Sequence, residues 1–105
     1  IELFVYGVQR DGGFPARQRR EASAAIARRH GLDPADMLLV QQSTAAIVAG
    51  AFHNDVVAVA NETVLFTHEQ AFEDPAGVYA FIRGSLPRKC RSRRRSGRIC
   101  STRNW

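Results

Sequence analysis

Residues 30–40, with the sequence HGLDPADMLLV, combine the end of a helix, a single turn and a strand in one short stretch. The pair His30-Gly31 suits a helix C-terminus, where a cation and a glycine are favoured. Asp33, followed directly by a proline, predicts one helical turn with the aspartate as its N-cap. The apolar run 37–40 is typical of a strand that is buried on both faces.

Upstream of this stretch the sequence predicts a strand and then a helix. Residues 1–6 form an apolar, β-branched and aromatic run that ends at a glycine, which favours a strand. A glycine-rich loop separates this run from residues 16–30, whose apolar side chains follow the helical period. The expected inward face of this helix comprises Ala22, Ala25, Ile26 and the stem of Arg29.

Downstream, the alternation of elements continues. We expect a short helix over 44–49, with Ser43 or Thr44 as its cap. Two apolar runs, 56–60 and 64–67, flank a short polar connection and predict a β-hairpin.

The last predicted element is a helix that starts at the Asp-Pro pair 74–75 and runs to about Arg83. The predicted order is β-α-β-α-β-β-α, which is typical of a mixed α/β layer architecture.

A length of 105 residues allows one small domain. No run of 18 apolar residues is present and the start lacks signal-peptide features, so we expect a cytoplasmic protein. Because the chain does not begin with methionine, we expect it to be a piece of a longer protein.

Charge divides the chain into an acidic body and a basic tail. Residues 87–105 hold eight Lys and Arg residues and no acidic residue, whereas residues 1–86 hold seven basic and ten acidic residues. The body therefore carries a net charge of −3 within a total of +5. Since residues 87–105 also lack an apolar face, we expect a disordered Arg-rich tail. The acidic body argues against a nucleic-acid-binding surface, and such tails are usually solvated coil.

Two other patterns are weak as metal sites. Cys90 and Cys100 both lie in the tail, so they cannot cross-link the body, and their spacing does not match a structural zinc site. The stretch 68–72, HEQAF, begins like the zinc motif HExxH, but Phe72 occupies the place of the second histidine. We therefore expect no metal ion.

The densest polar cluster in an apolar setting is the stretch 52–55, FHND. His53 and Asp55 are two residues apart, so in an extended chain their side chains point to the same side. Imidazole is suited to proton transfer near neutral pH, and a carboxylate can bind a guanidinium group through two hydrogen bonds. The alternative interpretation from spacing alone is a polar surface turn.

Arg17, in the stretch 14–18 with the sequence FPARQ, falls in the first turn of the predicted helix 16–30. A cation is mildly unfavourable there, because the N-terminal end of the helix dipole is positive. The position suggests that Arg17 pairs with a ligand carboxylate, whereas Arg19 and Arg20 are typical of a solvated face.

Several separate motifs resemble the N-succinylarginine dihydrolase family, and they occur in the order and spacing of that family. The match covers about residues 1–82. The matching segments are LFVYG at 3–7, FPARQ at 14–18 with EAS at 21–23, QQ at 41–42, AAI at 45–47, FHNDV at 52–56, VLF at 64–66 and His68.

The resemblance implies a fold and an activity. The family belongs to the guanidine-modifying, amidinotransferase-like superfamily of α/β propellers with five-fold pseudosymmetry. Residues 1–86 would then be a fragment of about one to one and a half propeller modules. Members convert N2-succinylarginine and two waters into N2-succinylornithine, two ammonia and carbon dioxide in arginine catabolism. The resemblance implies a small-molecule substrate and no metal or organic cofactor, and it is compatible with a homodimer.

The matching motifs also carry residue roles to this chain. His53 corresponds to the catalytic histidine of the family, and Asp55 and Arg17 correspond to substrate contacts. The family's catalytic glutamate lies upstream of the first strand, and its nucleophilic cysteine lies further downstream than Cys90 or Cys100. The chain is therefore expected to lack both groups and to be inactive by itself.

The sequence departs from the family pattern at three places. Val48 stands where the family usually has aspartate, and Ser43-Thr44 replaces the usual Asn-Pro. Beyond about Arg83 the resemblance is expected to end, so the tail is expected not to derive from the family.

Two alternative functions stay open. One is another guanidine hydrolase, such as an arginine deiminase-like enzyme, and the other is a non-enzymatic module whose basic tail binds nucleic acid.

Overall fold

The computed structural model describes residues 1–9, 11–61, 64–85 and 98–102. The elements in chain order are β1 (Glu2–Tyr6), α1 (Arg20–Arg29), η1 (Pro34–Asp36), β2 (Met37–Gln41), α2 (Thr44–Val48), α3 (Asn54–Val57), β3 (Ala58–Asn61), β4 (Val64–His68), α4 (Pro75–Ser85) and β5 (Arg98–Thr102). This order confirms the predicted α/β class.

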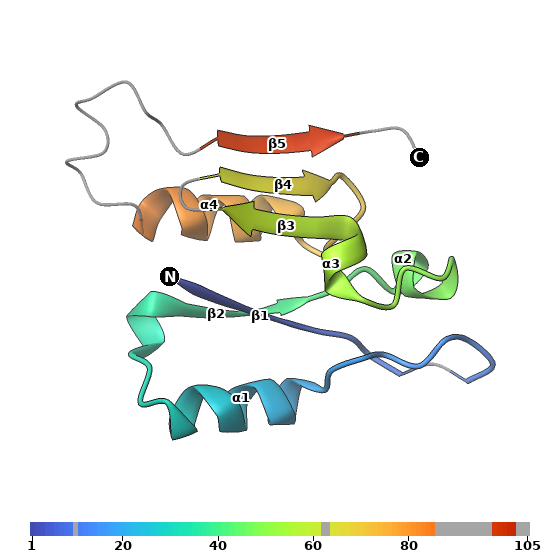
Figure 1. Ribbon diagram of the computed structural model, residues 1–105, viewed down its shortest axis with the longest axis horizontal. Helices are drawn as coiled ribbons and strands as arrows, with labels where there is room; N and C mark the ends of the chain where they lie inside the picture. Colours follow the sequence, from blue (N-terminus) through green and yellow to red (C-terminus); the bar gives the residue numbers. More distant parts are fainter. Residues whose placement is uncertain (10, 62–63, 86–97, 103–105) are drawn as a thin grey trace.

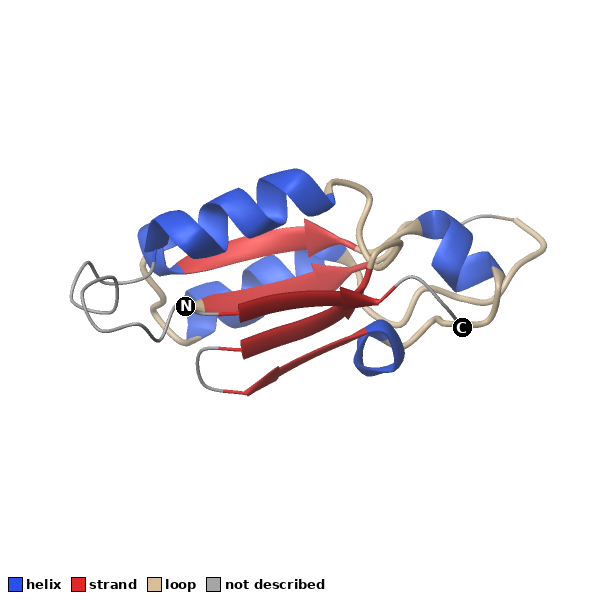
Figure 2. Ribbon diagram, turned by 90° about the horizontal axis from the view of Figure 1, so that it is seen from above, coloured by secondary structure: helices blue, strands red, loops and turns tan. Residues whose placement is uncertain are grey.

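Two small sheets make up the strand layer. One contains β1 and β2, and the other contains β3, β4 and β5 in that order. In the view of Figure 1 the β1–β2 pair lies between α1 and the second sheet. Figure 2 shows that the strands of both sheets run along nearly the same axis. No helix in the described part of the chain is long and apolar enough to span a membrane.

β1 and β2 pair in parallel, and α1 is the crossover between them. The register joins Glu2 to Met37 at one end and Tyr6 to Gln41 at the other. Parallel neighbours need such a connection, because the chain must return to the same end of the sheet before the second strand starts. α1 packs against both strands. The strands predicted from the sequence at 1–6 and 37–40 are confirmed.

α1 starts at Arg20, so the start predicted at residue 16 is wrong. The backbone ahead of the helix is used for another contact, since the Gly7 N–H donates to the Gln18 carbonyl at 2.9 Å. This bond ties the segment to the end of β1 instead of extending the helix. Arg17 therefore lies before the helix and not in its first turn.

The buried face of α1 also differs from the prediction. Ser23 and Ala27 are buried, one helical turn apart. Small side chains at these positions allow the helix to approach β1 and β2 closely. All four residues expected to face inward are exposed instead, namely Ala22, Ala25, Ile26 and Arg29. The prediction fails because it placed apolar side chains on the inward face whatever their size. Close packing of the helix against the strands requires small side chains on that face.

The turn before β2 forms as predicted. Asp33 caps η1, and its Oδ1 accepts the Ala35 N–H at 2.8 Å. Within β2 only Val40 is buried, and the other residues are half-buried. The expected burial on both faces is therefore reached only at Val40. Among the described residues β1 is the one strand that pairs with β2, and this leaves the rest of the strand partly open.

α2 confirms the short helix predicted after β2. Ser43 is its N-cap, and its Oγ accepts the Ala46 N–H at 3.3 Å. Gly50 follows the helix with a φ of 101°, a left-handed conformation that favours glycine.

The strand predicted at 56–60 begins two residues late. Residues 54–57 form the single turn α3, in which Val56 N–H donates to the His53 carbonyl at 3.2 Å, and β3 starts at Ala58. The helical turn directs Val57 into the core, where it is 4% exposed. β3 and β4 pair antiparallel, which confirms the hairpin, although residues 62–63 of its turn lie outside the described residues.

α4 closes the core. Asp74 precedes it, and its Oδ1 accepts the Gly77 N–H at 2.9 Å, so the predicted start at the Asp-Pro pair is confirmed. Val78 belongs to the buried core, and Ile82 packs against that core. The core joins side chains from β2, α3, β3, the segment before α4, and α4 itself: Val40, Val57, Ala58, Ala71, Phe72 and Val78.

The predicted disordered tail, 87–105, lies mostly outside the described residues. Residues 98–102 form β5, which pairs in parallel with β4, so the prediction of disorder is wrong for these five residues. β5 occupies the edge of β4 on the side away from β3.

The close approach at Gly7 generates the first prediction. A Cβ atom there would lie 2.7 Å from Ala16 Cβ and 2.8 Å from Ile47 Cδ1. Gly7→Ala should therefore push the segment before α1 away from α2 and destabilise the fold by about 1–3 kcal/mol. The measurement is the urea concentration at which half of the far-ultraviolet circular dichroism is lost, a value that can be compared between variants even where the transition is broad. Gly84→Ala is the matched control, because nothing lies within 4 Å of that Cβ position. Equal midpoints for the two variants would contradict the packing at Gly7.

The second prediction concerns folding of the isolated chain. Many apolar side chains are exposed, namely Ile1, Val8, Phe14, Ile26, Val48, Val56, Val59, Val64 and Phe66. Such a surface favours association and loose packing over a single cooperative transition. We expect the purified chain to form oligomers or aggregates, to bind hydrophobic dyes and to melt over a broad range. A monomer with a sharp calorimetric transition and dispersed amide resonances would contradict this expectation.

Candidate functional site

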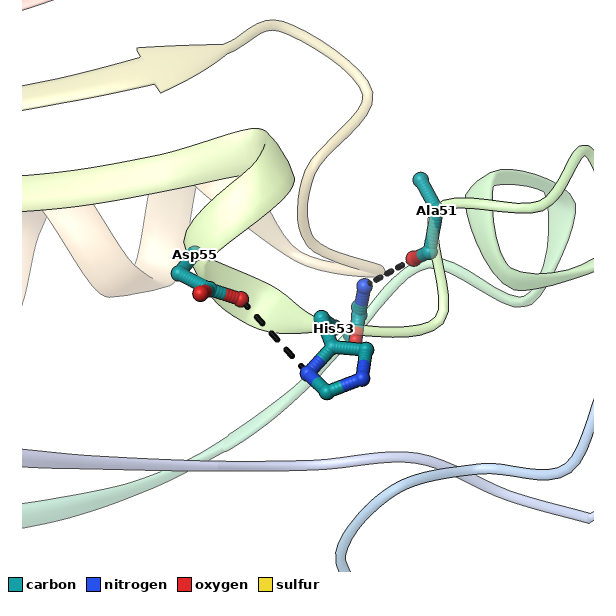
Figure 3. Close-up of polar contacts among 4 residues, drawn as sticks. Ala51, His53 and Asp55 are labelled. Atoms are coloured by element: carbon teal, nitrogen blue, oxygen red, sulfur yellow. Dashed lines mark hydrogen bonds and ion pairs between the residues drawn. The ribbon is translucent and has the colours of Figure 1, made fainter.

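His53 and Asp55 lie together at the start of α3. His53 is the N-cap, with an extended backbone, and Asp55 is in the first turn. His53 Nδ1 and Asp55 Oδ1 are 3.7 Å apart, and Figure 3 shows the imidazole and the carboxylate turned toward each other. The structure thus brings the two side chains together, but through a helical turn and not through the extended strand that the sequence analysis assumed.

Both side chains remain accessible. The His53 side chain is 36% exposed and the Asp55 side chain is 84% exposed. A water molecule or a substrate can therefore reach the pair from the solvent. The carboxylate can hold a cation, and the imidazole can give or take a proton beside it.

An aromatic stack connects His53 to the segment that carries Arg17. The rings of Phe52 and His53 have centroids 4.8 Å apart, tilted by 50°. Phe14 stacks on Phe52 with centroids 5.3 Å apart and an angle of 11°. Because Phe14 is three residues before Arg17, the stack keeps the segment that carries Arg17 near the His53 turn. No role was predicted for Phe14 and Phe52 from the sequence.

Arg17 is exposed and lies between β1 and α1. Within the described part of the chain, no ion pair joins it to an acidic side chain, Asp55 included. The structure therefore does not bring Arg17 into contact with the His53–Asp55 pair. Any joint action of the three residues requires a ligand that reaches from one to the other.

His68 belongs to a different environment. It is 8% exposed, and its Nδ1 accepts the Gln70 N–H at 3.1 Å, which orients the ring at the end of β4. Together with residues of α2 and α3 it lines a cavity of ≈ 450 Å³, which His53 does not line. Phe72, in the place of the second histidine of HExxH, is a core residue. Among the described residues no three potential metal ligands are grouped.

A comparison with known families gives one match over most of the chain. The succinylarginine dihydrolase family matches residues 1–94. The match continues past Arg83, where the sequence analysis expected the resemblance to end, and enters the basic tail.

Individual relatives agree with this match. The N-succinylarginine dihydrolase of Novosphingobium aromaticivorans is 64% identical over 87 residues, which are 83% of this chain and 20% of the relative. That of Sphingopyxis alaskensis is 64% identical over 87 residues, with coverage of 83% and 21%. That of Marinobacter nauticus is 53% identical over 93 residues, with coverage of 82% and 21%. The chain thus spans about a fifth of the length of these relatives. Since the family match includes nearly all of the residues that build the fold and the His53–Asp55 pair, this chain belongs to the succinylarginine dihydrolase family.

Proposed function

We propose that this chain contributes one part of the active site of an N-succinylarginine dihydrolase. The complete enzyme would hydrolyse N2-succinylarginine to N2-succinylornithine, ammonia and carbon dioxide in arginine catabolism. The observation that carries the proposal is the His53–Asp55 pair, an imidazole and a carboxylate 3.7 Å apart at an accessible turn of a chain from this family.

The two side chains suit the chemistry of a guanidinium group. Asp55 can accept two parallel N–H bonds from the guanidinium and hold it beside His53. A cysteine thiolate from a part of the enzyme outside this chain would attack the guanidinium carbon. His53 would protonate the departing ammonia and then take a proton from the hydrolytic water. This cycle runs twice, because the reaction consumes two waters and releases two ammonia molecules. The first cycle leaves a ureido group, and the second leaves a carbamate, which loses carbon dioxide to give N2-succinylornithine. Cys90 and Cys100 receive no role.

Arg17 would bind the succinyl end of the substrate. Its side chain is exposed, and among the described residues it makes no ion pair, so its guanidinium is available for a substrate carboxylate. The Phe14–Phe52 stack supports this role, since it holds the segment of Arg17 close to the turn of His53. Arg17 is a cationic anchor for the succinyl carboxylate, and it distinguishes this substrate from free arginine, which has no succinyl group.

We propose that residues 1–86 form about one to one and a half modules of a five-fold pseudosymmetric α/β propeller. The α/β class and the β3–β4 hairpin support this assignment. The complete enzyme would be cytoplasmic and would act as a homodimer, without a metal or organic cofactor. The Arg-rich tail would play no part in catalysis.

The roles are testable in a grafted enzyme, defined here as the Novosphingobium aromaticivorans relative with its matching segment replaced by the 87 residues of this chain that align with it. Identity of 64% over 87 residues favours folding of the graft. The graft should release ammonia from N2-succinylarginine. A folded graft without this activity would contradict the proposed function.

His53 should act in the chemical steps. In the grafted enzyme His53→Ala should lower kcat by about 10²–10⁴-fold with a smaller change in KM. Asp55→Asn should lower kcat and raise KM, because the carboxylate binds the guanidinium both before and during the reaction. His30→Ala is the matched control, since His30 is an exposed histidine at the end of α1. A kcat for His53→Ala equal to that of the control would remove His53 from the mechanism.

Arg17 should act in substrate binding. Its carboxylate partner is unchanged between the ground state and the transition state, so Arg17→Ala should mainly raise KM. The loss should be about 1.5–3 kcal/mol for a charge-assisted hydrogen bond. The ratio of kcat/KM for succinylarginine to kcat/KM for free arginine should fall by the factor that corresponds to this free energy. Steady-state kinetics on both substrates test this, with Arg20→Ala, an exposed arginine nearby, as the control. An unchanged preference would remove Arg17 from the site.

The 105-residue chain should be inactive by itself. A proton-transfer group without the thiolate nucleophile cannot carry out covalent catalysis. We expect the purified chain to release no more ammonia from N2-succinylarginine than its His53→Ala variant releases. Ammonia release above that control would show that the chain contains a complete site.

A further inference from the structure

Gln42 is a buried polar side chain directly after β2. It is 4% exposed, and its Nε2 donates to the Ala51 carbonyl at 2.6 Å. Figure 3 shows this bond at Ala51, on the segment that leads to His53. A buried amide is costly to leave without a hydrogen bond, so the bond strongly favours one conformation of this segment.

The backbone of Gln42 is itself fixed. Its N–H donates to the Tyr6 carbonyl at 2.7 Å, which extends the β1–β2 pairing by one residue. It also forms an isolated antiparallel bridge with Phe72, a core residue. The amide group therefore projects from a rigid part of the fold.

The segment that receives this bond ends at His53. Ala51 N–H donates to the Ala46 carbonyl at 2.9 Å, so the backbone of Ala51 is held by α2 on one side and by Gln42 on the other. Phe52 then stacks on Phe14, and His53 follows. The two bonds at Ala51 thus set the direction in which the chain enters the His53 turn.

We propose that Gln42 is a positioning residue for the His53 imidazole. Its amide holds the Ala51 carbonyl, and this bond orients the imidazole toward the reacting guanidinium carbon. Asp55 depends less on the bond, because α3 is anchored in the core through Val57. The catalytic part of this inference rests on the proposed function of His53, whereas the control of the position of His53 does not.

The kinetic test compares two neighbouring glutamines in the grafted enzyme. Gln42→Met keeps the length of the side chain but removes the donor. It should lower kcat by about ten- to hundred-fold, because a shift of about 1 Å in a catalytic group has an effect of this size. KM should change little, since the Gly7–Gln18 backbone bond still holds the segment of Arg17 and the core contact of Val57 still holds α3, which carries Asp55. Gln41→Met is the matched control, because Gln41 accepts the Glu73 N–H at 3.1 Å through its backbone carbonyl, and the substitution leaves this bond intact.

A second measurement reads the position of His53 without the reaction. The rate of carbethoxylation of His53 by diethyl pyrocarbonate, followed by peptide mass spectrometry, should rise several-fold in Gln42→Met and stay constant in Gln41→Met. His30 serves as the internal reference. If Gln42→Met does not fold, Gln42→Asn replaces it, since its amide is one methylene too short to reach Ala51.

The outcomes separate the two proposals. An active graft in which Gln42→Met and Gln41→Met share the same kcat and the same His53 reactivity would overturn the role of Gln42. A folded graft that is inactive without any substitution would overturn the proposed function, and the His53 reactivity would then decide the role of Gln42. A loss of kcat with unchanged KM and raised His53 reactivity would support the positioning role.

Discussion

The parallel pairing of β1 with β2 is the constraint on which the candidate site depends. Both strands end at the same edge of their sheet, where Tyr6 pairs with Gln41. Parallel strands place the segments that follow them side by side, and ligand sites of α/β proteins commonly form at this edge. Here the segment after β1 carries Arg17 and the segment after β2 leads to His53. A single pairing therefore brings together two parts of the chain that are far apart in sequence.

Two close contacts then hold these segments against each other. Gly7 has no side chain, and this allows Ala16 and Ile47 to approach the backbone within van der Waals contact. At the outer end, Phe14 stacks on Phe52. The first contact is steric and involves the buried side chain of Ile47, and the second is a ring contact at the surface. Both link the segment of Arg17 to the region that carries His53, so they keep the two segments near each other.

The β3–β4 hairpin has an unusual outer face for a small domain. Val59 and Phe66 lie opposite each other on it, with exposures of 58% and 45%. Antiparallel sheets that face water usually carry polar side chains there. The chain spans about a fifth of the length of its relatives, and a large share of its apolar surface is exposed. The exposed apolar face of the hairpin, at Val59 and Phe66, does not include His53 or Asp55.

Local patterns in the sequence were sufficient for the α/β class and most of its elements. The caps Asp33 and Ser43 bond to residues two and three positions away, so the sequence alone specifies them. The apolar runs of β1 and β2 and the hairpin follow from the same kind of short-range information. The family motifs pointed to His53, Asp55 and Arg17 as site residues, and their roles stay predictions. The presence of these side chains is thus a property of the sequence.

Tertiary structure decided what depends on distant partners. α1 starts at Arg20 and not at residue 16, because the Gln18 carbonyl accepts a hydrogen bond from the Gly7 N–H. Residues 54–57 form the helical turn α3 and not the start of a strand, because Val57 packs into the core. The relation between Gln42 and Ala51 has no sequence signal, since a glutamine at a strand end predicts no partner nine residues later. Sequence periodicity reports hydrogen bonds and contacts within one element. The direction of the His53 side chain depends on contacts between elements, and only the folded chain determines these.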